Sequence, residues 1–91
     1  MHHETAISLG FEALTFILSE DELKERFMAL TGLSPGALSE NIENDAFLAS
    51  VLEFLIGHEP DLITYAEQSQ TSPTDVVLAW RQLGGGVGQE W

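Results

Sequence analysis

The chain has 91 residues, 44% of them hydrophobic, and a formal net charge of −12, because fifteen acidic residues face only three Lys or Arg. This length suits one domain with one modest core, and the hydrophobic content argues against disorder. Three cations cannot neutralise a row of phosphates, which excludes nucleic acids and anionic membranes as partners. The absence of cysteine excludes disulfides, thiol nucleophiles and cysteine zinc sites.

The first predicted helix, over residues 4–18, is apolar around most of its circumference, which is typical of a buried helix. Gly10 in its middle indicates either a close crossing with another helix or a glycine that is simply tolerated there. Ser19 and Glu22 have the spacing of a capping box, and this pair predicts the start of the second helix. Gly32 is placed to end that helix in the left-handed conformation.

Four further helices follow in the same manner. Ser34 as the cap and Pro35 as the first residue predict a short helix that continues to about residue 41. Asn44 caps an apolar helix over 45–56, and Pro60 opens a fifth over about 60–69. The pair Ser72 and Pro73 opens a sixth over 73–83. No strand pattern competes. We therefore predict an all-α fold: a compact bundle of five or six short helices in a single domain, 1–84, with a glycine-rich tail, 85–91.

The chain contains an internal similarity at an offset of 38 residues, because 12–38 aligns without a gap with 50–76. Identical residues are Leu14/Leu52, Phe16/Phe54, Ser34/Ser72 and Pro35/Pro73. Such a period indicates a repeated helical unit, so we expect two similar helical-hairpin halves around the central helices 4–18 and 45–56. Either duplication or convergence on good caps produces this pattern. The second half lacks the glycine of the Gly32 turn, and we expect a different helix end there.

Several motifs suggest chemistry at first sight, but each has a simpler interpretation. The glycines at 84–88 follow a helix, whereas a phosphate loop precedes one. His2 and His3 lie at a frayed end, and His58-Glu59 lacks the second histidine of a zinc helix. Ser19, Ser34 and Ser72 occupy cap positions. We therefore expect no catalytic residues, no metal site and no cofactor, and we predict that the protein is not an enzyme.

Two tryptophans are candidates for binding a partner. Trp80 lies on an apolar helical face and is most simply a core residue, whereas Trp91 ends the glycine-rich tail and either folds back or meets a partner. Together with Arg81, these residues form our candidate partner-binding set.

Four strings carry a resemblance to a known family: ALTFIL, RFMALTGLSP, FLASVLEFLIGHE and SPTDVVLAWRQLGG. Over residues 5–84 the chain resembles a small all-helical bacterial family, common in alphaproteobacteria, that is catalogued only as a domain of unknown function. The resemblance implies a compact helical domain and brings no catalytic residue, cofactor or substrate.

Three functions stay open at this point. The first is a non-catalytic protein-interaction or regulatory module in the cytoplasm of a bacterium, with a partner that the acidic surface would favour to be basic. The second is a small-molecule-binding regulatory domain with its site between the halves, and the third is an enzyme without a recognisable motif. A homodimer through helix 4–18 or 45–56 would cover any surplus apolar surface.

Overall fold

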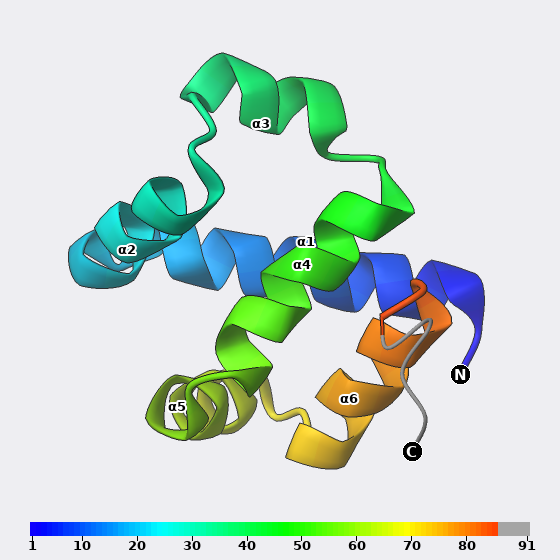
Figure 1. The fold of residues 1–91 in the computed structure, drawn as a ribbon. Coiled ribbons are helices and arrows are strands. Elements are labelled where there is room, and N and C mark those ends of the chain that lie inside the picture. The colour runs from blue at the N-terminus through cyan, green and yellow to red at the C-terminus, as the bar shows by residue number, and fades with distance from the viewer. Residues whose placement is uncertain (86–91) are drawn as a thin grey trace.

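The helix boundaries follow the sequence signals closely. The computed structural model describes residues 1–85, so the expectations for Trp91 and most of the tail lie outside the described residues. Within this range the chain forms helices and no strand (Figure 1). The elements are α1 (His3–Ser19), α2 (Asp21–Thr31), α3 (Pro35–Asn41), α4 (Asp45–Ile56), α5 (Glu59–Ser69) and α6 (Pro73–Gln82). The predicted all-α bundle is confirmed.

The core lies where α1, α4 and α6 pack on one another (Figure 1). Its fully buried side chains come from all three helices and include Ala13, Ile17, Leu52, Leu55 and Val76. Gly10 lets α1 and α4 approach closely, because a Cβ there would lie 3.1 Å from the Cβ of Leu48. The expected close crossing and the central place of α1 and α4 are confirmed, and α6 shares that place.

Three of the predicted caps are present. The backbone N–H of Ala37 donates to the Ser34 hydroxyl at 3.3 Å, and that of Asp75 donates to the Ser72 hydroxyl at 3.1 Å. The Asn44 side chain accepts from the Phe47 N–H at 3.0 Å. Each such bond satisfies one of the free N–H groups at a helix start, which explains why α3, α4 and α6 begin where they do.

The predicted capping box at Ser19 is wrong. Ser19 is the last residue of α1, and its hydroxyl donates back to the Phe16 carbonyl at 2.8 Å. Glu20, in extended conformation, precedes α2 and makes no side-chain cap bond. A serine hydroxyl in a last helical turn can bond the carbonyl three residues earlier, and this local bond takes the place of the cap.

The internal repeat is present in the structure. The bounds of α2 and α5 differ by 38 residues at both ends, and α3 and α6 start at Pro35 and Pro73, the same distance apart. The missing glycine does not change the helix end as we expected: Gln70 has φ +57° and Gly32 has φ +67°, both left-handed.

The two halves nevertheless pack differently. α6 lies against both α1 and α4, whereas α3 stands apart from α4 as an arch (Figure 1). Leu38 is the one side chain described in α3 that is buried, and it reaches the core cluster. The first half therefore leaves its third helix loosely seated.

The surplus apolar surface that favoured a homodimer is largely covered. The residues of α1 and α4 that are exposed are polar, apart from Ala46. A homodimer through these helices thus stays a prediction without its original support. Within residues 1–85, no helix combines the length and the apolar character needed to cross a membrane.

Candidate functional site

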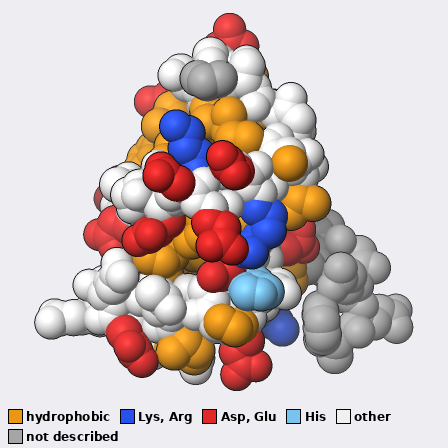
Figure 2. All heavy atoms as spheres, turned by 90° about the vertical axis from the view of Figure 1, so that its left-hand side faces the viewer, with side chains coloured by type: hydrophobic (Ala, Val, Ile, Leu, Met, Phe, Trp, Pro, Cys, Tyr) orange, Lys and Arg blue, Asp and Glu red, His pale blue; other side chains and the backbone are white. Residues whose placement is uncertain are grey.

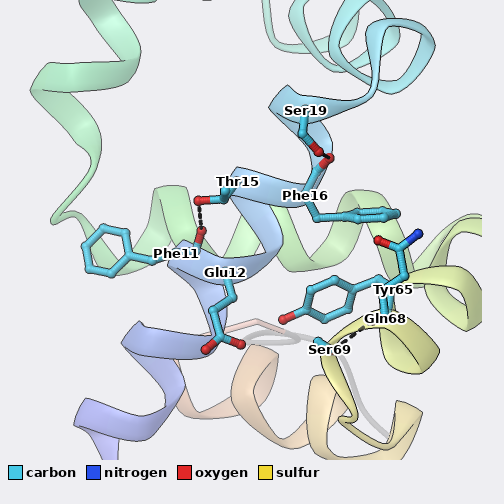
Figure 3. Close-up of a pocket in the computed structure, with 8 residues that line it drawn as sticks. All are labelled: Phe11, Glu12, Thr15, Phe16, Ser19, Tyr65, Gln68 and Ser69. Carbon is cyan, nitrogen blue, oxygen red and sulfur yellow. Dashed lines mark hydrogen bonds between the residues drawn. The ribbon is translucent and has the colours of Figure 1, made fainter.

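An open groove of about 510 Å³ lies between α1 and α5 (Figure 3). We call it the α1–α5 groove. α1 supplies residues that recur every three or four positions and therefore share one helical face. α5 supplies the opposite wall in the same way. The lining residues are Phe11, Glu12, Thr15, Phe16, Ser19, Tyr65, Gln68 and Ser69.

Aromatic rings form the apolar base of the groove. Phe16 and Tyr65 are buried, with ring centroids 5.5 Å apart and planes inclined at 57°. The Tyr65 hydroxyl donates to the Leu9 carbonyl at 3.3 Å, which ties α5 to α1. Phe11 is half-buried on α1, and its ring points away from the Phe16–Tyr65 pair (Figure 3). Packed rings of this kind give the groove a defined shape.

The hydroxyl groups of the groove are committed to the backbone. Thr15 donates to the Phe11 carbonyl at 3.0 Å, and Ser69 donates to the Tyr65 carbonyl at 2.7 Å, as Ser19 does to Phe16 (Figure 3). None of these hydroxyls is hydrogen-bonded to a histidine or carboxylate that could activate it as a nucleophile. Glu12 is the single charged residue in the lining.

Burial moves the ionisation of Tyr65 further above the physiological pH range. Loss of hydration raises the pKa of Tyr65 to about 12, and the negative charge of Glu12 adds to this effect. A side-chain hydrogen bond with Ser69 partly offsets the increase. Figure 3 shows the phenol hydroxyl directed toward the side of α1 that carries Glu12. Tyr65 is therefore a positioned donor and not a base.

A second cluster joins α2 to α5 beside the groove. Arg26 forms an ion pair with Asp61, and Nδ1 of His58 lies 2.7 Å from the same carboxylate oxygen. The guanidinium carbon of Arg26 also lies 5.1 Å from the centroid of the Phe54 ring. The one hydroxyl side chain lining the adjoining hollow, Thr64, donates to the Pro60 carbonyl at 2.9 Å. The cluster thus has a histidine oriented by a carboxylate but no nucleophile beside it.

The sequence contained no signal for this cluster. Arg26 and Asp61 are 35 residues apart, and neither belongs to a motif with a known spacing. The surface around α2 and α5 is mostly acidic, with few basic side chains between the carboxylates (Figure 2). Arg26 is therefore engaged by an internal partner and adds little to the charge that an approaching molecule meets.

A profile of one protein family, described as a protein of unknown function (DUF3572), matches residues 3–86 and so nearly the whole described chain. The chain belongs to the DUF3572 family. This confirms the small all-helical family of unknown function that the sequence strings resemble. No curated protein and no solved structure matches the chain.

In this DUF3572 member, the two described candidate partner-binding residues, Trp80 and Arg81, do not line the α1–α5 groove. Trp80 is 8% exposed and packs in the core, and the Gly85 N–H donates to its carbonyl at 2.8 Å. A Cβ at Gly85 would lie 2.2 Å from the indole nitrogen, so only glycine fits there. Arg81 is exposed on α6, and Trp91 lies outside the described residues. Their role in binding stays a prediction.

His3 and His58 of this DUF3572 member each lie beside a carboxylate. Nε2 of His3 lies 2.7 Å from an Asp45 carboxylate oxygen and links the starts of α1 and α4. Within residues 1–85, no three side chains of the His, Cys, Asp or Glu type gather as metal ligands would. The His3–Asp45 contact thus fastens two helix ends.

Proposed function

We propose that the protein is a non-catalytic binding module whose α1–α5 groove takes a basic, partly apolar segment of a partner protein. The observation that supports this most is the composition of the groove: aromatic side chains form its base, and Glu12 is its single charged lining residue. A lysine or arginine flanked by apolar residues matches both features, since aromatic faces attract cations as carboxylates do.

The chemistry of the lining favours binding over catalysis. Its hydroxyls donate to helix carbonyls, and burial raises the pKa of its phenol to about 12. A general base would need a pKa near neutrality, and a nucleophile would need an adjacent base. Tyr65 meets neither need. The His58–Asp61 pair is engaged with Arg26, which supports a role in joining α2 to α5.

The shape of the groove favours a protein segment over a small molecule. Small-molecule sites usually enclose most of the ligand surface. The α1–α5 groove is open and runs between two helices, a geometry that suits a helix or an extended peptide with apolar anchors at regular spacing. Recognition would then rest on a few anchors in the groove and on charge around it.

The charge of the whole chain favours a basic partner. With a net charge of −12, the protein attracts a cationic segment before contact, which raises the association rate. Figure 2 shows carboxylates spread over the face of α2 and α5, next to the α5 wall of the groove. An acidic segment would be repelled by the same surface.

A direct test uses a short amphipathic peptide that carries lysine and leucine on one face. Fluorescence anisotropy should detect binding to the wild type, and Glu12→Gln should weaken it about three- to ten-fold because the groove carboxylate is lost. Glu53→Gln is the matched control: it removes the same charge from an exposed position on α4 that does not line the groove.

Three outcomes decide the proposal. The proposal is supported if Glu12→Gln lowers the affinity for the peptide more than Glu53→Gln does. It is also supported if a peptide with glutamate in place of lysine does not bind. Equal weakening by the two variants would show that net charge alone attracts the peptide, and the groove would lose its role.

A further inference from the structure

The two halves of the repeat differ at the positions where α3 and α6 could pack against the core. At the offset of 38 residues, Ser39, Asn41 and Ile42 stand where the second half has Val77, Ala79 and Trp80. In α6, Ala79 and Trp80 are buried and seat that helix on α1 and α4. In the first half Ser39 and Asn41 are polar and are not buried, and Ile42 is 38% exposed.

An apolar crevice of about 260 Å³ results beneath α3, which we call the α3 crevice. Leu14 and Leu18 of α1 and Met28 of α2 form one side, and Leu38 and Ile42 form the other. At about 30 Å³ for each water-sized group, this volume holds roughly nine methylene-sized groups. The crevice opens to solvent, so an aliphatic group that enters it would displace water from apolar walls.

Lys24 lies at the edge of the α3 crevice, and its ammonium has no ion-pair partner among residues 1–85. This is notable in a chain with fifteen carboxylates. Asp21 and Glu25 line a shallow hollow together with Lys24 and Met28, yet neither carboxylate pairs with the ammonium. The crevice therefore combines an aliphatic lining with one available positive charge.

From these observations we propose that the α3 crevice binds a medium-chain fatty acid, with the aliphatic chain beneath α3 and the carboxylate at the Lys24 ammonium. The Lys24 ammonium would pair with the anionic head group locally, against the repulsion of the neighbouring Asp21 and Glu25, and the aliphatic lining selects the tail. The site is separate from the α1–α5 groove, since the two share no lining residue. Binding would seat α3 on the core, as Trp80 helps to seat α6.

The first experiment measures binding of decanoate to the full chain by calorimetry, below the concentration at which decanoate forms micelles. Affinity should rise about four-fold for each methylene from hexanoate to decanoate, the factor expected for burial of one methylene at about 0.8 kcal/mol. Decanol should bind more weakly than decanoate, because it has no charge to pair with the Lys24 ammonium. Equal binding of decanol and decanoate would overturn the proposed role of Lys24.

Two substitutions locate the site. Lys24→Met keeps an unbranched side chain but removes the charge, so decanoate should bind about three- to five-fold more weakly while decanol is unaffected. Lys24→Arg keeps the positive charge and should bind decanoate as the wild type does. Ile42→Trp introduces at position 42 the residue that the second half has at the equivalent position, Trp80. The larger side chain should fill the crevice and abolish binding of both decanoate and decanol.

A measurement on the wild type makes the result independent of any variant. The methyl resonances of Met28 and Ile42 should shift as decanoate is added. The methyls of Leu30 should not, because Leu30 lies on α2 with Met28 but is 72% exposed and outside the crevice. Unchanged Met28 and Ile42 resonances, or decanoate binding that survives Ile42→Trp, would refute the proposal.

Discussion

Tyr65 connects three features of the molecule through one side chain. Its ring packs on Phe16, its hydroxyl bonds the Leu9 carbonyl, and its burial beside Glu12 raises its pKa to about 12. A tyrosine in an unfolded chain has a pKa of about 10. The native state therefore holds the phenol proton more tightly than the unfolded state does, and native stability must depend on pH in the alkaline range.

We predict that the tyrosine contribution is fully present below pH 10 and is lost as pH rises through 12, since the unfolded chain releases the proton first. Urea denaturation between these values should show the wild type losing stability faster than Tyr65→Phe, which shares every other titrating group. At neutral pH, Tyr65→Phe should cost about 0.5–1.5 kcal/mol for the lost hydrogen bond. Parallel pH profiles of the two proteins would contradict the assigned burial.

The ends of α2 and α5 have the same left-handed geometry but different residues. Gly32 adopts it without strain, whereas Gln70 carries a Cβ in a conformation that costs non-glycine residues about 1–2 kcal/mol. Nothing lies within 4 Å of a Cβ built at Gly32, so the backbone alone decides the effect of a substitution there. The repeat thus offers a strained helix end and an unstrained one in a single chain.

We predict opposite effects of exchanging these two residues. Gln70→Gly should raise the free energy of unfolding by about 0.5–1 kcal/mol, because relief of strain exceeds the extra flexibility of glycine in the unfolded chain. Gly32→Gln should lower it by a similar amount. Both positions are exposed, so chemical denaturation should show altered midpoints with unchanged slopes. A destabilising Gln70→Gly would mean that the Gln70 side chain makes a contribution that outweighs the strain.

At the level of elements, short sequence patterns predicted the starts of three helices, because the bonds that cap a helix join residues close together in the chain. Ser34, Asn44 and Ser72 cap helices because the bonds involved span three residues. The cap predicted at Ser19 was wrong, because a serine hydroxyl at the end of a helix can instead donate to a carbonyl of the preceding turn, here that of Phe16. The Arg26–Asp61 link and the α1–α5 groove depend on how helices distant in sequence meet, which no short pattern records.

For the whole molecule, the internal repeat predicted two similar halves and the central pair α1 and α4. It did not predict that α6 would join that pair while α3 would not. The difference lies in a few residues: Val77, Ala79 and Trp80 give α6 an apolar face, whereas the equivalent positions of α3 include Ser39 and Asn41. A repeat fixes the order of the helices, and the packing of each helix depends on which side chains it presents.

The charge of the whole molecule leads to a last prediction. Fifteen carboxylates and only three Lys or Arg give the net charge of −12, and the fold has a radius of gyration of 12.2 Å, so like charges repel over short distances. Sodium chloride at 0.1 M reduces the screening length to about 10 Å and weakens this repulsion more than it weakens the few ion pairs. The melting temperature should therefore rise with salt, by about 4–8 °C for each kcal/mol gained. Chloride is the appropriate anion, because sulfate strengthens apolar burial in any protein. A flat or falling melting temperature would mean that Arg26–Asp61 and similar contacts outweigh the repulsion.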